Sequence, residues 1–201
     1  MNHRNPKRPH FGRRRPSFKN RGFQGRGRQP HPKLIRANQL FSQGEYLRAA
    51  GLYEELAMMA ERRQSPRSPR AFLQTGRALI LGGKTEAGFG KIQHAFHLLH
   101  NHHRKQEIIR LLPIADNELS ENGMDHQSKI LREWANNNGY ELFELLDKND
   151  NMEIETQKDN RILPDTCNRC GAIIHPKEIE WVDSITAECS YCGTLVRIIE
   201  K

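Results

Sequence analysis

Cysteine is scarce in this sequence, and long apolar runs are absent. Its 201 residues include four cysteines, all of them after residue 166. No stretch approaches the roughly twenty apolar residues of a membrane-spanning helix, so we expect no membrane partner. The N-terminus lacks the apolar core of a secretory signal, which predicts a cytoplasmic protein with reduced thiols.

Patterns typical of catalysis are also missing. The sequence has no serine elbow, no glycine-rich dinucleotide loop and no paired catalytic carboxylates. The segment LGGKT at 81–85 is similar to the end of a phosphate-binding loop, but Ala78 stands where that loop needs glycine. The acidic segment 147–159 lacks the residue order of a calcium loop, and we interpret it as a linker. We therefore predict that the protein is not an enzyme.

Five histidines gather in one short segment. They are His94, His97, His100, His102 and His103. The spacing of the first two would allow them to chelate a metal from one helix face. Because no H-E-x-x-H arrangement is present, metalloprotease chemistry has no base. We favour a basic helix C-terminus, where protonated imidazoles interact well with the helix dipole.

Acidic residues are absent from residues 1–33, which carry eleven Lys and Arg. The whole chain is +8, so this tail holds +11 and the remainder is −3. The tail is rich in Pro, Gly, Asn and Gln, and its apolar residues are three phenylalanines and the initial methionine. Such a segment cannot bury enough surface to offset its conformational entropy, so we predict disorder. An organellar transit peptide is the weaker alternative, because helix breakers are frequent.

The tail also has the chemistry of a nucleic-acid ligand. Guanidinium groups pair with phosphates and stack on bases, and phenylalanines offer further stacking faces. The tail resembles Arg-Gly-rich RNA-binding segments, although true tripeptide repeats are absent, and we expect RNA more than DNA. The alternative is a solubilising or ribosome-adhering tail with no dedicated ligand. The cations expected to contact nucleic acid are Arg4, Lys7, Arg8, Arg13, Arg14, Arg15, Lys19, Arg21, Arg26 and Arg28.

Between Leu34 and about Asn138 the apolar residues follow the spacing of amphipathic helices. Gly44, Gly83 and Gly123 are 39 and 40 residues apart, each between two such segments. A glycine there can end a helix in the left-handed conformation before the chain turns back. We predict three helical hairpins, followed by a capping helix near 140–146. The clearest stripe comprises Tyr46, Ala49, Ala50, Tyr53, Leu56, Ala57 and Ala60.

The first hairpin resembles a tetratricopeptide repeat in the pattern Ala37-Asn38-x-x-Phe41-x-x-Gly44-Glu45-Tyr46-x-x-Ala49-x-x-x-Tyr53. The second and third units keep fewer of these positions, and the spacing exceeds the family's usual 34 or so. The resemblance implies stacked hairpins with a concave groove for a protein partner. The alternative is a small helical bundle without a groove. The extra length is assigned to loops at 61–70 and 100–105, and Pro113 should kink or begin its helix.

The four cysteines form two C-x-x-C pairs, each followed by glycine. The residues are Cys167, Cys170, Cys189 and Cys192. Eighteen residues separate the pairs, enough for two strands that bring the pairs together into a tetrahedral four-thiolate site. Zinc is the expected ion, and a rubredoxin-type iron is the alternative. Free thiols or disulfides fit less well, because a bridge within one pair would close a strained loop.

Strands are predicted at 172–174, 178–182 and 194–199, and the segment from residue 162 to residue 201 resembles a zinc ribbon. A unit of this size cannot build a sufficient core, so the metal should supply its folding free energy. Ligation by four thiolates leaves no open position, which predicts a structural metal and not a catalytic one.

Together these patterns predict a multidomain fold: a disordered tail (1–33), an all-α tetratricopeptide-like domain (34–148), an acidic linker (149–161) and a small β zinc ribbon (162–201). The expected function is a non-enzymatic adaptor, with the helices holding a protein partner and the tail attaching to nucleic acid. The alternative is a dedicated RNA- or DNA-binding protein that uses ribbon and tail. A zinc-dependent enzyme is the least favoured class.

Overall fold

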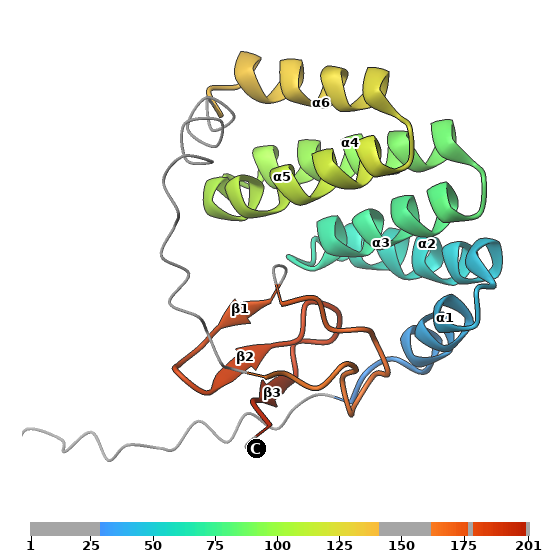
Figure 1. Cartoon of the computed structure of the whole chain (residues 1–201), viewed down its shortest axis with the longest axis vertical. Helices are drawn as coiled ribbons and strands as arrows, with labels where there is room; N and C mark the ends of the chain where they lie inside the picture. The colour runs from blue at the N-terminus through green and yellow to red at the C-terminus, as the bar shows by residue number, and fades with distance from the viewer. Residues whose placement is uncertain (1–28, 141–161, 177–178, 200–201) are drawn as a thin grey trace, which may run out of the picture.

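The computed structural model of the chain describes residues 29–140, 162–176 and 179–199. These residues form six α-helices followed by three short β-strands (Figure 1). The basic tail before residue 29, the predicted acidic linker and nearly all of the predicted capping helix lie outside the described residues. None of the described helices combines the length and the apolar character that crossing a membrane requires.

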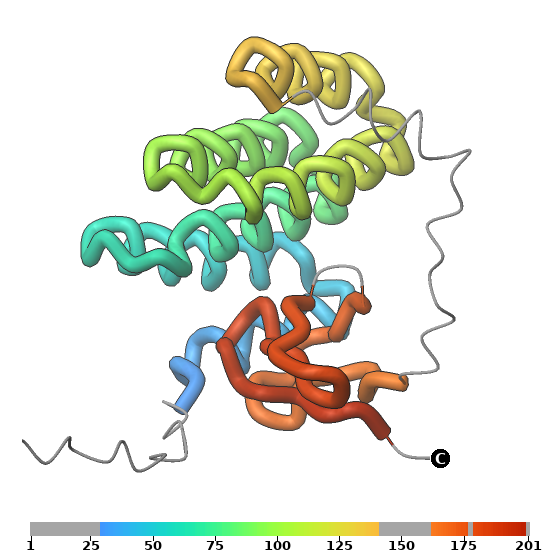
Figure 2. Tube along the Cα trace, turned by 90° about the vertical axis from the view of Figure 1, so that its left-hand side faces the viewer, coloured from blue at the N-terminus to red at the C-terminus, as the bar shows by residue number. Residues whose placement is uncertain are grey.

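The six helices form three hairpins, which we call the helical array. The hairpins are α1 (Pro32–Ser42) with α2 (Tyr46–Arg62), α3 (Ser68–Leu81) with α4 (Thr85–Asn101), and α5 (Lys105–Glu121) with α6 (Asp125–Asn137). Gly44, Gly83 and Gly123 lie in the three turns with φ of +78°, +79° and +70°. These values confirm the left-handed turns predicted from the sequence. Figure 2 shows the hairpins stacked one on another.

Helices α3 and α4 cross at two glycines. A Cβ on Gly76 would lie 2.8 Å from the carbonyl oxygen of Gly88, and a Cβ on Gly88 would lie 2.7 Å from the carbonyl oxygen of Gly76. Both contacts would be shorter than normal van der Waals distances. The backbones therefore approach so closely that neither position has room for a side chain.

The third hairpin has a polar contact at the equivalent crossing. Asp116 and Ser128 are 12 residues apart, as are the two glycines of the second hairpin. The Ser128 hydroxyl donates to the Asp116 carboxylate at 2.5 Å, and Arg132 Nη2 lies 2.7 Å from the other carboxylate oxygen. This buried network explains why the third unit lacks the small residues of the first two.

The connections between hairpins are shorter than the sequence predicted. Helix α3 begins at Ser68, inside the expected 61–70 loop, and Pro69 occupies its first turn. Proline is favoured there because its missing N–H would have no partner in the helix. Pro113 lies inside α5, so the expectation that the helix begins at this proline was wrong.

The three strands form one antiparallel sheet in the order β1 (Glu180–Trp181), β2 (Thr186–Glu188), β3 (Leu195–Arg197). We call residues 162–176 and 179–199 the cysteine unit. Strand β2 was not predicted, and the predicted strand 172–174 has only one isolated bridge, between Thr166 and Ile173. The sheet is small because the two cysteine turns occupy much of the unit.

Candidate metal centre

Two similar turns carry the four cysteines. In the first, the amide of Gly171 donates to the carbonyl of Cys167 at 2.8 Å; in the second, the amide of Gly193 donates to the carbonyl of Cys189 at 2.9 Å. Both glycines have φ of +71°, a conformation that side chains rarely adopt. Each turn therefore depends on the glycine that follows its second cysteine.

The two turns bring the four sulfurs together. All four Sγ atoms lie within 4.8 Å of one another, and all four cysteines are buried. The separations between Cys167 and Cys192 and between Cys170 and Cys189 are both 3.8 Å. Sulfurs placed tetrahedrally at about 2.3 Å from an ion would be about 3.8 Å apart. These four side chains can therefore hold a metal ion.

The sulfurs interact strongly, and backbone groups favour their charged forms. The hydrogen bond with Cys170, followed by those with Cys189 and Cys192, lowers the pKa of the Cys167 thiol, and the same bond with Cys167 raises the pKa of Cys170. The amide of Arg169 donates to Cys167, and the amide of Ala172 donates to Cys170. Burial opposes the charged form of each thiol, so a bound cation would offset the cost of holding thiolates in this buried place.

A buried side chain of α1 joins the first cysteine turn to the helical array. Asn38 Nδ2 donates to the carbonyl oxygen of Cys170 at 2.7 Å. The hydroxyl of Tyr53, on α2, donates to Asn38 Oδ1 at 2.6 Å. Burial, and then the proximity of Tyr191 and Cys170, raises the pKa of Tyr53 and keeps its hydroxyl protonated. The Cys170 carbonyl is thus held by a two-residue hydrogen-bonded chain.

The second cysteine turn lies against α3. The Tyr191 hydroxyl donates to Gln74 Oε1 at 2.9 Å, and the guanidinium of Arg67 lies beside Gly193. Leu34, on α1, packs against both the cysteine unit and the core of the first hairpin. The cysteine unit therefore contacts the array through the first helices of the hairpins, which are α1 and α3.

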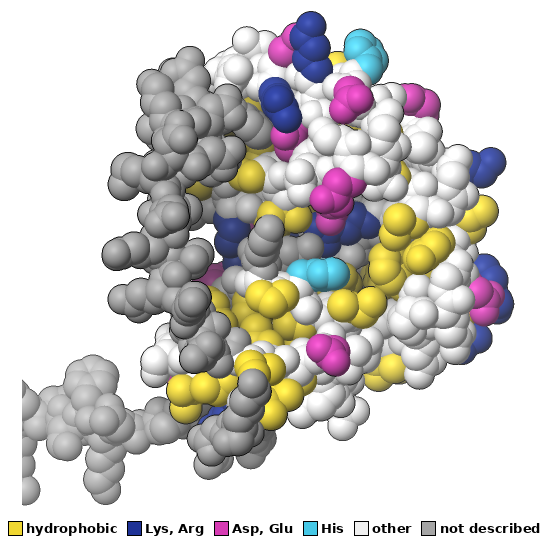
Figure 3. Space-filling model, in the orientation of Figure 1, with side chains coloured by type: hydrophobic (Ala, Val, Ile, Leu, Met, Phe, Trp, Pro, Cys, Tyr) yellow, Lys and Arg dark blue, Asp and Glu magenta, His cyan; other side chains and the backbone are white. Residues whose placement is uncertain are grey.

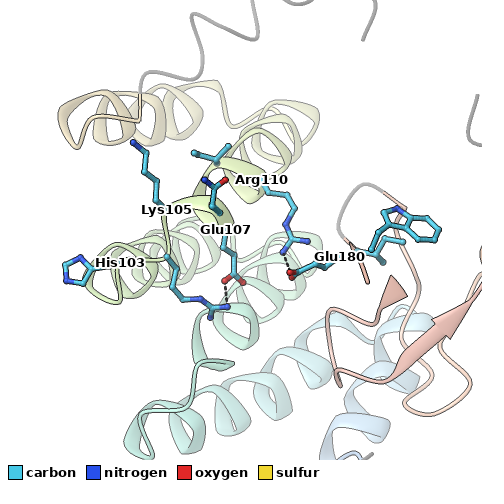
Figure 4. A pocket seen from close by; sticks show the side chains of 10 residues that line it. His103, Lys105, Glu107, Arg110 and Glu180 are labelled. Carbon is cyan, nitrogen blue, oxygen red and sulfur yellow. Dashed lines mark ion pairs between the residues drawn. The ribbon is translucent and has the colours of Figure 1, made fainter. Parts of the chain in front are cut away.

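Helix α5 faces the cysteine unit across an open cleft of about 650 Å³ (Figure 4). Glu180, on β1, lies 3.5 Å from Arg70 Nη2 and 3.7 Å from Arg110 Nη2. Arg70 also pairs with the buried carboxylate of Glu107 at 2.7 Å. The two arginines that line the cleft are Arg104, which pairs with Glu107, and Arg110, which pairs with Glu180, so charge joins the two parts here.

The structure gives the histidines other partners than a metal. His94 Nε2 lies 2.8 Å from Glu61 Oε1, and His100 Nδ1 lies 2.8 Å from the Tyr140 hydroxyl. His97 contacts Trp134 edge to face. Within the described residues, the four cysteines form the one group of three or more side chains able to hold a metal. The tail cations Arg4 to Arg28 lie outside the described residues.

Sequence reasoning missed Asn38 as part of this centre. It was assigned to the helical pattern, and its bond to Cys170 joins residues 132 positions apart. A polar residue within an otherwise small and apolar stripe was the available signal.

Comparisons with protein-family models, with curated proteins and with solved structures found no match to this chain. The described fold and site define a helical array that carries a small sheet and a four-cysteine cluster able to hold a metal.

Proposed function

We propose that this protein is a non-enzymatic adaptor. Its C-terminal zinc ribbon packs against a tetratricopeptide-like array, and its basic tail binds RNA. The observation that carries the proposal is the four-sulfur cluster with its hydrogen bond to α1. All four cysteines are at most 6 % exposed, which leaves no open side for a substrate. A metal held there would fix the shape of the protein.

Zinc fits the donor set best. Four thiolates in two C-x-x-C turns are typical of structural zinc, and the 3.8 Å sulfur separations match its bond lengths. Iron accepts the same ligands, and elemental analysis of the purified protein distinguishes the two ions. No oxygen or imidazole ligand is needed to complete the site.

The tetratricopeptide resemblance is supported by the recurrence of one turn geometry. Glu45, Lys84 and Met124 each follow the turn glycine and donate to the carbonyl five residues earlier, at 2.8 to 2.9 Å. The cysteine unit lies on α1 and α3, helices that would line the groove of such an array. We therefore place protein partners on surfaces other than the part of the groove that the ribbon covers.

The ribbon exposes an apolar surface suited to a protein partner. Six large aliphatic side chains of this small unit are exposed, among them Val182 at 57 % and Leu195 at 54 %. Backbone bonds from Ile198 to Ile185 and from Ile199 to Ile162 bring several of them together. Hydrophobic side chains gather over this part of the molecule in Figure 3. Exposed apolar groups in such number are typical of an interaction surface. They are Ile162, Ile173, Val182, Ile185, Leu195 and Ile199.

The partners can be tested by purifying the tagged full chain from its own cells with and without nuclease. We expect protein partners that survive nuclease and are lost when Val182 and Ile185 are both changed to Asp. Leu47 and Met58 are exposed on α2 and provide the matched control when changed to Asp. Deleting residues 1–33 should remove only the nuclease-sensitive material. If every partner were lost on nuclease treatment, the result would contradict the adaptor function and favour a dedicated nucleic-acid-binding protein.

That second function has one observation in its favour. A second cleft, between the array and the second cysteine turn, is lined by arginines and by no acidic residue. A zinc-dependent enzyme would require an exogenous ligand on the ion, which metal spectroscopy would detect.

A further inference from the structure

The second cleft has a volume of about 710 Å³ and lies where α2, the start of α3 and the second cysteine turn meet. This volume is within the range of ordinary ligand sites. Tyr191 and Cys192 supply the wall from the cysteine unit, and residues 29–32 supply an edge. The cleft therefore exists only while the two parts of the molecule are docked.

The charged residues that line the cleft have one sign. Three arginines line it, together with His31, and none of its lining residues is Asp or Glu. Arg70 is neutralised by Glu107, as described above. For Arg63 and Arg67, the described residues provide no ion pair and no hydrogen bond to the guanidinium. These two cations can therefore face an anionic ligand. The Glu188 carboxylate lies near one of them, because a Cβ on Gly193 would be 2.4 Å from Arg67 Nη2 and 3.0 Å from Glu188 Oε1.

The rest of the lining is apolar or carries neutral hydrogen-bonding groups. Leu56 and Met59 lie one turn apart on α2 and are half-buried, and Arg63 is the residue that caps the C-terminal end of this helix. Ser190 and Tyr191 bring hydroxyl groups from the opposite side. The arrangement suits a ligand that combines a flat or apolar group with a negative charge. A nucleotide has this combination, with a base that packs on aliphatic side chains and a phosphate that pairs with arginine.

The position of the cleft favours nucleic acid over an acidic peptide. The chain enters the described structure at Gln29, which lines the cleft, and the residues before it carry ten Lys and Arg and no acid. The tail is itself cationic and so is disfavoured as the occupant. A polyanion bound by the tail would continue into the cleft, and a phosphodiester chain has its charges at regular intervals. A duplex is too wide for a cavity of this size, which leaves a single strand.

We propose that the cleft between α2, α3 and the second cysteine turn binds single-stranded nucleic acid, with phosphate on Arg63 and Arg67 and a base against Leu56 and Met59. The site deepens the proposed function, because it rests on a docked, metal-held ribbon and adds a folded contact to the tail. RNA and DNA share the required phosphate and base, and the probes below distinguish them.

The test uses the full, metal-loaded chain and a fluorescent dodecamer of uridylate or of deoxythymidylate. Changing Arg63 and Arg67 together to Ala should weaken binding about tenfold and lower the salt slope by about 1.4, at roughly 0.7 per phosphate contact on a single strand. Lys84, in the turn of the second hairpin, and Lys129, on α6, are exposed cations outside the cleft. Changing both to Ala removes the same charge and should alter affinity less than twofold at physiological salt, where charges beyond about 8 Å are screened. Binding of either dodecamer through Arg63 and Arg67 supports the site.

The tail is tested separately by deleting residues 1–28. If the Arg63/Arg67 variant binds like its control while the deletion abolishes binding, the cleft proposal is overturned and the tail proposal stands. If the deletion has no effect while the Arg63/Arg67 variant loses affinity, the tail proposal fails and the cleft stands.

Two further measurements locate the strand. A dodecamer containing 4-thiouridine should cross-link to α2 or to the second cysteine turn, and cross-links confined to residues 1–28 would overturn the proposal. A twelve-residue glutamate peptide should compete weakly. If it matched the dodecamer in affinity and in dependence on Arg63 and Arg67, the cleft would be an acidic-peptide site instead.

Discussion

The helical array and the cysteine unit keep their shapes by different means. The main core of the array comprises eighteen buried residues from α2 to Tyr140, among them the fully buried Phe96 and Ile92. The buried cluster of the cysteine unit has nine residues, and four of them are the cysteines. Its strands are two or three residues long. We therefore expect apolar burial to be sufficient for the array and the cysteine unit to depend on a bound ion.

Removal of the metal should have the largest effect. Changing Cys189 to Ser is expected to cost much of the binding free energy, on the order of 10 to 16 kcal/mol in comparable zinc sites, and to unfold the cysteine unit. The array should keep its helical circular dichroism. Metal content and amide exchange of residues 162–199 check both halves of the prediction, with the exposed change Val182 to Ala as the control. Loss of the helical signal together with the metal would contradict the independence of the array.

Truncation of an aromatic side chain in the core of the array should destabilise the array and leave metal binding unchanged. Changing the fully buried Phe96 to Ala is expected to destabilise the array by about 3 to 5 kcal/mol, through lost burial and a cavity. Metal stoichiometry at moderate temperature should not change. Urea unfolding followed by circular dichroism measures the loss, and Lys129 to Ala, an exposed change, should have an effect within about 0.5 kcal/mol. Metal release by this variant under native conditions would argue against separate sources of stability.

A substitution of Asn38 should affect both the stability of the helical array and the retention of metal by the cysteine unit. Replacing it with Ala leaves the Cys170 carbonyl and the Tyr53 hydroxyl without their partner, at a cost of about 1 to 3 kcal/mol. We expect lower array stability and faster loss of metal to a chelator in the same variant. Tyr53 to Phe keeps the bond from Asn38 to Cys170 and should cost less. A change in array stability with unaltered metal retention would show that the bond does not couple the two parts.

The smallest effect is expected at high pH. Because burial raises the pKa of Tyr53, the folded state resists its ionisation. This contribution is fully present below the pKa of tyrosine in the unfolded chain, about 10, and is lost as pH rises above it. The loss should approach about 1.4 kcal/mol per pH unit. The free energy of unfolding, measured in urea between pH 9 and pH 11, should therefore fall more steeply for the natural chain than for the Tyr53→Phe variant. Parallel curves would contradict a raised pKa for Tyr53.

Features that depend on local sequence could be predicted. Gly44, Gly83 and Gly123 mark turns that need a left-handed residue, and the two C-x-x-C-Gly segments form the turns that their spacing predicts. These signals are contained within a few residues, so one sequence is enough to recognise them.

Features that depend on contacts between distant residues could not be predicted from the sequence. Strand β2, at Thr186–Glu188, is specified by pairing with strands on both sides, because the segment itself has no strong alternation. The position of the cysteine unit on α1 and α3 follows from contacts of Asn38, Gln74 and Tyr191, and no local motif specifies which distant residue each of them contacts. The start of α3 at Ser68 had a local signal in Pro69, but the repeated Ser-Pro-Arg suggested a loop.

The bond from Asn38 to Cys170 also has a consequence for the order of events during synthesis. Its two residues are 132 positions apart, so at 5 to 20 residues per second a ribosome takes roughly 7 to 26 s to pass from one to the other. During that interval α1 and α2 can pair and the Tyr53 hydroxyl can donate to Asn38, but the Asn38 amide lacks its acceptor, the Cys170 carbonyl. In the nascent chain, Asn38 and Tyr53 therefore remain a hydrated polar pair on the surface of the first hairpin until the cysteine unit has been synthesised and has folded.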